Sequence, residues 1–168
     1  MKLLMFFALF ATSTFAEIFN AEEYKLFSSS WNTVKHNEVD ILYYVFKNYP
    51  EMQARFPAFV GKDLDSIKGS AAFALHATRI VSFLSDVVQL MSNEGNDPAI
   101  NTVISQLAAN HKNRGITKPE LRRFGNVLVE YLKENVPQWN EDVAAVWNTA
   151  METNYGILFS HFDRKSMH

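Results

Sequence analysis

The chain of 168 residues is long enough for one domain with a substantial hydrophobic core, and its formal net charge is only −2. Because it has no long basic run and no basic amphipathic segment, we expect neither nucleic acid nor a membrane as a partner. It contains no cysteine, which excludes disulfides, cysteine nucleophiles and cysteine-ligated metal or cofactor sites.

The first residues, MKLLMFFALFATSTFA, have the layout of a secretory signal peptide. A single lysine precedes a short apolar run, and the small residues Thr14 and Ala16 stand just ahead of Glu17. The run is too short to span a membrane comfortably. We therefore expect residues 1–16 to be removed and a secreted, extracellular domain to comprise residues 17–168. The alternative is an apolar amino-terminal helix that belongs to the domain.

The next segment predicts two helices, then a short third one and a loop. Asn20 and Glu23 form a capping pattern for the first helix. The second helix ends before Pro50, because a proline disfavours helical geometry in the residue before it. Pro50–Phe56 has the length of about two helical turns, and residues 57–65 are predicted to form a loop with at most one turn in it.

Two long helices are predicted next, and each carries a histidine on its apolar face. The first, Ser66–Met91, places His76 in line with apolar residues at helical spacing. The second, Asp97–Gly115, begins at Asp97, whose side chain can accept hydrogen bonds from the first free backbone amides. Its apolar stripe ends on His111.

Two further helices complete the prediction. Thr117 and Glu120 form a second capping box, and Pro137 separates this helix from the last one. A polar tail, residues 163–168, follows. No β-rich stretch bounded by turn residues occurs in the sequence, so we expect an all-α domain with about seven to eight helices.

The two histidines suggest a cofactor site. A single histidine on an apolar face is more often a core residue that bonds a nearby carbonyl, because an unpaired buried nitrogen costs a few kcal/mol. Here, however, two long helices each place a histidine on an apolar stripe. Such helices can hold a flat apolar cofactor between them, with one histidine on each side. The 14 Phe residues suit such a pocket, although they suit ordinary packing as well. The pattern predicts a haem pocket.

Two stretches carry a family likeness: PEMQARFPAFVGKDLDSIKGSAAFALHATRIVSFLS at residues 50–85 and ANHKNRG at residues 109–115. They resemble insect haemoglobins of the midge-larva type, and the likeness covers essentially the whole chain after residue 16. The resemblance implies a globin fold. HKNRG replaces the HKPRG of relatives, and the linker at residues 93–97 is longer than in the shortest of them. Both departures lie in loops and leave the expected haem site intact.

The resemblance also implies a role for individual residues. His111 would be the proximal iron ligand, and His76 would be the distal residue over the gas site. Arg79 would reach a haem propionate; the alternative is a solvated helix charge. The apolar residues expected around the haem could also be ordinary core residues; they are Leu42, Phe56, Phe59, Ile80, Leu107, Ile116, Leu121 and Phe124.

In function, the resemblance implies an extracellular haemoglobin that contains haem b. It would bind O₂ and other diatomic gases reversibly on ferrous iron, for transport or storage, as a monomer or homodimer and not as an enzyme. One alternative is a haem enzyme, such as a nitric oxide dioxygenase or a peroxidase-like protein. Another is a secreted helical binding protein without haem. A zinc site is a weaker possibility, because the sequence has no HxxxH or Cys/His cluster.

Overall fold

The computed structural model describes residues 18–163, apart from the side chain of Glu94, and its regular structure in that part of the chain is helical throughout. Eight α-helices occur there, as expected, with one short 3₁₀ helix before α6. The predicted signal peptide and the end of the polar tail lie outside the described residues. The helices are α1 (Ala21–Val34), α2 (Glu38–Asn48), α3 (Pro50–Gln53), α4 (Leu64–Lys68), α5 (Ala71–Leu90), α6 (Asp97–Asn113), α7 (Lys118–Asn135) and α8 (Glu141–Asp163).

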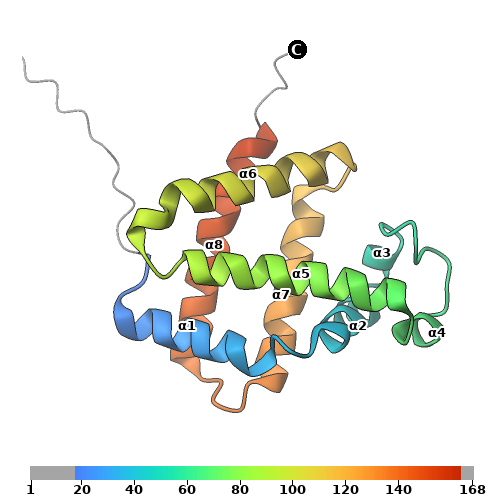
Figure 1. Cartoon of the computed structure of the whole chain (residues 1–168), viewed down its shortest axis with the longest axis horizontal. Coiled ribbons are helices and arrows are strands. Elements are labelled where there is room, and N and C mark those ends of the chain that lie inside the picture. Colours follow the sequence, from blue (N-terminus) through green and yellow to red (C-terminus); the bar gives the residue numbers. More distant parts are fainter. Residues whose placement is uncertain (1–17, 164–168) are drawn as a thin grey trace, which may run out of the picture.

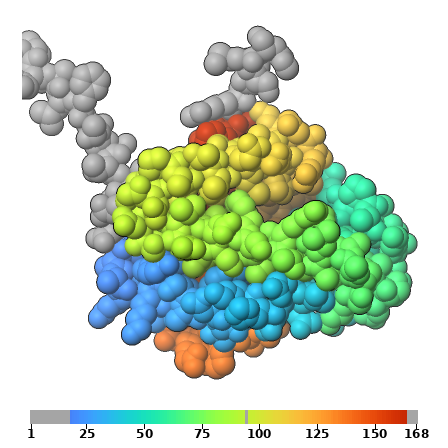
Figure 2. Space-filling model, in the orientation of Figure 1, coloured from blue at the N-terminus to red at the C-terminus, as the bar shows by residue number. Residues whose placement is uncertain are grey.

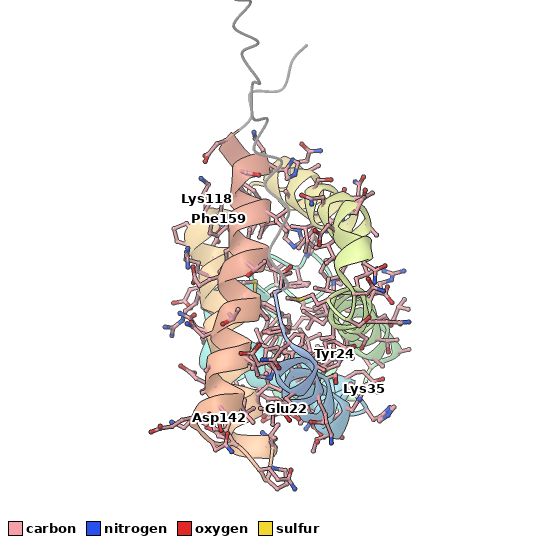
Figure 3. All side chains as sticks on the ribbon, turned by 90° about the vertical axis from the view of Figure 1, so that its left-hand side faces the viewer. Glu22, Tyr24, Lys35, Lys118, Asp142 and Phe159 are labelled. Carbon is pink, nitrogen blue, oxygen red and sulfur yellow. The ribbon has the colours of Figure 1, made fainter. Side chains whose placement is uncertain are left out.

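The helices cross one another in two layers. Figure 1 shows α5 and α6 lying across α7 and α8, with α1 below them and α2 at the side of α3 and α4. The contacts between α6 and α8, between α1 and α8 and between α2 and α7 join the layers. Viewed from the side of α8, side chains fill the space between α8 and the helices opposite it (Figure 3). By length and hydropathy alone α5 could also cross a membrane, but it packs here against α1, α2 and α6.

Both capping boxes predicted from the sequence are present. The Asn20 side chain accepts hydrogen bonds from the backbone of Glu22 and Glu23, and the Glu23 carboxylate accepts one from the backbone N–H of Asn20. Thr117 and Glu120 make the same reciprocal bonds at the start of α7. These local contacts satisfy amides that a helix start leaves without partners.

One predicted helix and one predicted cap were wrong, although α6 begins at Asp97 as expected. The helix expected over residues 66–91 is divided, because α4 ends at Lys68 and the Ser70 hydroxyl, which caps α5, accepts a hydrogen bond from Phe73 N. Asp97 is not a cap. Asn96 occupies the cap position without a side-chain capping bond, and its amide instead donates to Leu90 O. The chain thus stays turned between α5 and α6, which sets these two helices side by side.

The buried side chains form two clusters. The larger lies among α1, α5, α6, α7 and α8, and there the indole of Trp147 donates to the buried hydroxyl of Ser30, 2.8 Å away. The smaller lies among α2, the residues after α3, the first half of α5 and α7. Phe124 packs against both clusters. The smaller cluster fixes the part of α5 that carries His76.

Candidate functional site

The two histidines lie on neighbouring helices. His76 is in the first half of α5 and His111 is near the end of α6, and both are half-buried. The two helices pack against each other, and Figure 2 shows that the surface is hollowed between them. The fold thus places both imidazoles on the two helices that border one hollow.

His111 has one nitrogen engaged and the other available. Its Nδ1 lies 2.9 Å from the carbonyl oxygen of Leu107, one turn earlier on α6. A carbonyl only accepts, so Nδ1 carries the proton and Nε2 of the neutral ring carries a lone pair. Burial lowers the pKa of His111; the Leu107 carbonyl opposes this, and Arg114 adds to it. Because the charged form is disfavoured, the ring is neutral at neutral pH.

Aromatic rings surround His76 on the other helix. The centroid of its imidazole lies 4.9 Å from that of Phe56 and 5.6 Å from that of Phe59, and both rings approach nearly perpendicular to it. Neither nitrogen of His76 makes a hydrogen bond within residues 18–163. Burial lowers the pKa of His76, and Arg79 and Arg114 lower it further. His76 is therefore also a neutral imidazole, with polar atoms available to a ligand.

The segment that carries Phe56 and Phe59 is fixed by packing and by one amide. Phe46 on α2 lies 5.0 Å from Phe56 and 6.0 Å from Phe59, measured between ring centroids. The Gln53 side-chain amide donates to the carbonyls of Phe59, at 2.9 Å, and Lys62, at 2.8 Å. The loop therefore holds its two rings against α5 in one arrangement.

The comparison with known families decides what this arrangement is. The Globin family matches residues 39–158, from α2 to the second half of α8. The chain is a globin.

Relatives of this globin occur in insects. It is 50% identical to Globin CTT-Z of Chironomus thummi thummi over 159 aligned residues. The aligned region covers 95% of this chain and 97% of that protein. Globin CTT-V of Chironomus thummi piger is 48% identical, with the same coverage of 95% and 97%. Among solved structures, a haemoglobin component (TA-VII) from Tokunagayusurika akamusi has a TM-score of 0.82 and 41% identity, over 84% of this chain and 95% of that one. These findings confirm the resemblance to midge haemoglobins and the globin fold.

The donor set of this globin fits a haem. Globins hold haem iron through a proximal histidine, and a ligating imidazole usually donates its other N–H to a carbonyl or carboxylate. The bond from His111 to Leu107 has this geometry and leaves Nε2 without a hydrogen bond in the described part of the chain. The fit rests on this nitrogen of His111, which is on one of the two helices that border the hollow.

The other residues expected at the site are distributed over both clusters. Leu42 and Phe59 are completely buried in the smaller cluster, and Phe56 and Ile80 pack partly exposed against it. Four residues on the side of His111 are half-buried; they are Leu107, Ile116, Leu121 and Phe124. Arg79 is exposed on α5. The structure brings Phe56, Phe59 and His76 into direct contact, and it shows no partner for Arg79 within residues 18–163.

Two features of the site were not predicted. Arg114, which has no role in the predicted site, acts electrostatically on both histidines. Its position three residues after His111, at the carboxyl end of α6, was a usable signal for the effect on His111. The second feature is an ion pair between Arg55 and Glu120. No local pattern marks it, because its partners are 65 residues apart in the sequence.

Proposed function

We propose that this globin holds haem b between α5 and α6 and uses it to bind O₂, and other diatomic gases, reversibly. The observation that carries the proposal is the free Nε2 of a neutral His111, whose Nδ1 proton is held by Leu107. Haem, when bound, supplies ferrous iron with one position open to a gas ligand. In this proposal His111 is the proximal ligand and His76 is the distal residue.

The protein contributes the orientation of the proximal imidazole. Metal ligation needs the unprotonated nitrogen of a neutral ring, and burial keeps His111 in that form. The bond to Leu107 fixes both the tautomer and the plane of the ring relative to α6. The tautomer that can ligate iron is then already present before haem enters.

On the distal side, His76 is a donor in an apolar setting. A hydrogen bond from its ring to a partly negative gas ligand is worth about 1.5–3 kcal/mol, which slows release by roughly tenfold to a hundredfold. The rings of Phe56 and Phe59 hold the imidazole in place and limit the access of water. Less water near the ligand slows the oxidation of iron. A single hydrogen-bond donor to the gas, His76, slows release without preventing it, which supports the function of a reversible carrier.

The remaining assignments belong to the same proposal. Leu42 and Ile80 would wall the gas pocket, and Phe56 and Phe59 would pack on the distal face of the haem. Arg79 would pair with a propionate, since it is exposed on the α5 helix one turn from His76. The proximal side or haem edge would be lined by Leu107, Ile116, Leu121 and Phe124.

We further propose that the protein is secreted and carries or stores O₂ outside cells, as a monomer or homodimer. The order of residues 1–16 supports this, since it is typical of a signal peptide. Expression of the full chain in insect cells should release protein into the medium, and its amino-terminal sequence should begin near Glu17. Retention in the cells with residue 1 still present would contradict the proposal.

The visible spectrum tests the main proposal. Purified protein is reduced with dithionite, exposed to air and then evacuated again. A five-coordinate deoxy spectrum that converts reversibly to an oxy spectrum would support haem binding, the open position and gas carriage together. A six-coordinate deoxy spectrum would contradict the assignment of His76 as a purely distal residue. No haem band after reconstitution with hemin would overturn the proposal.

A further inference from the structure

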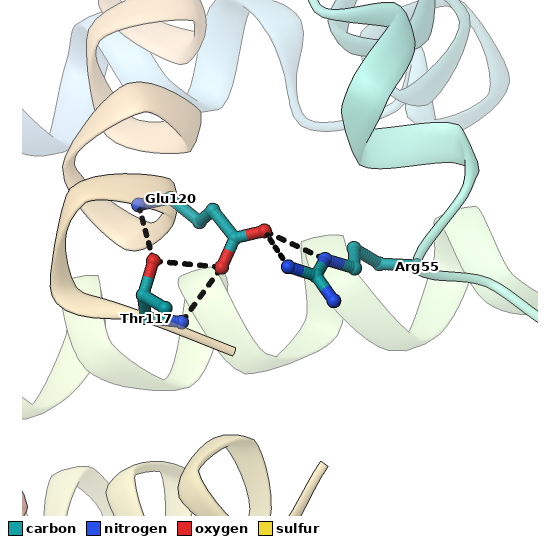
Figure 4. Close-up of polar contacts among 3 residues, drawn as sticks. All are labelled: Arg55, Thr117 and Glu120. Atoms are coloured by element: carbon teal, nitrogen blue, oxygen red, sulfur yellow. Dashed lines mark hydrogen bonds and ion pairs between the residues drawn. The ribbon is translucent and has the colours of Figure 1, made fainter. Parts of the chain in front are cut away.

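An ion pair joins two segments that border the proposed haem pocket. Arg55 follows α3, and Glu120 is in the first turn of α7. The Nε and one terminal nitrogen of Arg55 each lie 2.6 Å from Oε1 of Glu120. Figure 4 shows the Glu120 carboxylate between Arg55 and Thr117.

The two oxygens of Glu120 have separate tasks. Oε2 accepts hydrogen bonds from the Thr117 backbone, at 2.8 Å, and from the Thr117 hydroxyl, at 2.7 Å. These bonds fix the carboxylate to the start of α7 and leave Oε1 for Arg55. The Glu120 side chain is only 15% exposed, while that of Arg55 is 43% exposed. The Glu120 carboxylate is therefore held in place by Thr117, and the long, more exposed side chain of Arg55 reaches it from the segment after α3.

Each partner is adjacent to one side of the pocket. Phe56 follows Arg55 directly, and its ring contacts those of Phe46 and His76. On the other side, Ile116 N donates to His111 O, so the turn that leads to Thr117 and Glu120 is tied to the end of α6. The pair thus connects the residue before the distal phenylalanine to the segment that follows the proximal histidine.

Aromatic and cationic groups support this corner. Arg123 lies over the ring of Tyr49, with its guanidinium carbon 5.6 Å from the ring centroid. Burial raises the pKa of Tyr49, and the nearby charge of Glu120 raises it further, whereas Arg123 and Arg55 lower it. Tyr49 and Arg123 therefore lie close to the pair. Without Glu120, Arg55 would lose the carboxylate that it contacts, while Glu51, whose charge also acts on Tyr49, would remain.

We propose that Arg55 and Glu120 form a clasp that positions Phe56 and closes one edge of the haem pocket, and thereby slows the departure of haem. The inference rests on the proposed haem site. The two residues act through Phe56 and are positioning residues, since neither is assigned to the iron or to the gas. The same clasp holds the loop after α3 against α7 in the absence of haem.

The test compares four variants of the full holo protein: Arg55→Gln, Glu120→Gln, the double variant and Arg55→Lys. Glutamine at 120 keeps one oxygen that can accept the capping bonds from Thr117, and it places an NH2 group, which only donates, where Oε1 accepts from Arg55. Haem loss is followed as transfer to excess apomyoglobin. Each glutamine variant should lose haem about two- to fivefold faster, as for a partly exposed ion pair. The double variant should be no faster than either single one, and Arg55→Lys should recover part of the difference.

A control is the pair Arg122–Glu152, which joins α7 to α8 at 2.8 Å; its arginine is 47% exposed, close to the 43% of Arg55, while Glu152 is 56% exposed. Glu152→Gln should leave haem loss unchanged. Equal rates in Arg55→Gln and the parent, or additive effects in the double variant, would overturn the clasp.

A second measurement separates this inference from the haem proposal. Amide hydrogen exchange at residues 50–60 of the apo protein should be faster in Arg55→Gln than in the parent, and unchanged in Glu152→Gln. If no haem binds at all, the proposed function fails, while exchange still reports on the contact itself. Faster exchange without faster haem loss would overturn the role in haem retention.

Discussion

The Nδ1 proton of His111 points at the carbonyl oxygen of Leu107, 2.9 Å away on the same helix. The bond fixes the tautomer of the ring, so that Nε2 has no proton and is free to ligate a metal. No other group within residues 18–163 competes for this nitrogen. Removal of the imidazole should consequently leave the rest of the site in place and take away only the ligand.

His111→Gly should therefore lose haem or hold it loosely, and added imidazole should restore the parent spectrum by occupying the space of the side chain. The visible spectrum after gel filtration, with and without imidazole, measures this. His36→Gln is the control, because His36 is exposed in the turn between α1 and α2. A parent-like spectrum in His111→Gly without imidazole would contradict the proximal assignment.

His76→Leu should raise the O₂ dissociation rate by roughly tenfold to a hundredfold, because leucine fills the space but donates no hydrogen bond. Autoxidation should accelerate as well. Flash photolysis and stopped-flow mixing measure the dissociation rate. The neighbouring Leu75 is 53% exposed, so Leu75→Ala should leave that rate as in the parent. An unchanged rate in His76→Leu would mean that the imidazole does not contact the gas.

Arg79→Ala should raise the rate of haem loss about two- to fivefold, since an exposed ion pair to a propionate contributes modestly. Transfer of haem to apomyoglobin measures the rate, and Arg79→Lys should retain part of the effect because it keeps the charge. If alanine has no effect, Arg79 is a solvated helix charge, which is the alternative that the sequence left open.

Much of the fold could be predicted because it depends on local chemistry. The capping box of Thr117 and Glu120 spans three residues, so its spacing is visible in the sequence, and the structure confirms it. The apolar stripes that end on His76 and His111 follow from helical spacing alone. By contrast, Ser70 caps the start of α5 although the helical pattern predicted for residues 66–91 continues on both sides of it. The sequence alone did not distinguish a Ser70 that caps a new helix, by accepting a hydrogen bond from Phe73 N, from a serine inside one continuous helix.

The unpredicted contacts depend on how distant segments meet. The clasp joins residues 65 positions apart, and the bond from Trp147 to Ser30 spans 117. Each requires the crossing of particular helices, which periodicity does not encode. The same holds for Arg114, whose effect on His76 requires α6 to lie beside α5. A resemblance to a family supplies such relations only for the residues that the family motif includes.

Gly125→Ala should destabilise the protein by about 1–3 kcal/mol, as expected for overpacking of a tight contact. A Cβ at Gly125 would overlap the Tyr155 hydroxyl and the end of Met151, where α8 lies against α7. The Tyr155 ring cannot withdraw freely, because its hydroxyl lies over the carbonyls of Leu121 and Arg122 and its ring stacks on Phe159. Figure 3 shows Phe159 and Lys118 at this seam.

Gly156 provides the matched control for this prediction. It lies on the exposed side of α8, and a Cβ there would meet no atom within 4 Å. Gly156→Ala should stabilise the protein by about 0.5–1 kcal/mol, because alanine loses less backbone entropy than glycine in a helix. Urea unfolding measures both variants. Equal and small effects of the two substitutions would show that α7 and α8 are not in tight contact at Gly125.

Acidification should weaken the apo protein through Glu120. Burial opposes the ionisation of this carboxyl, but the hydrogen bonds from Thr117 and the charge of Arg55 outweigh it, so the pKa of Glu120 lies below its ordinary value of 4.5. Above that value the carboxylate is ionised in both the folded and the unfolded chain, and the stabilisation is complete. As the pH falls below it, the unfolded chain takes up the proton first, and the stabilisation is lost through the folded-state pKa.

Urea unfolding of the apo protein between pH 6 and pH 3 measures this loss. In Glu120→Gln the free energy of unfolding should fall less over that interval than in the parent, and in Arg55→Gln it should fall by an intermediate amount, because the bonds from Thr117 remain. The charge of Glu51 also acts on the neighbouring Tyr49, but Glu51 is present in every variant, so the difference between variants reports on Glu120. Glu152→Gln is the control, since its carboxylate is 56% exposed beside Arg122. The same acid slope in Glu120→Gln and the parent would show that the Glu120 carboxylate does not stabilise this corner.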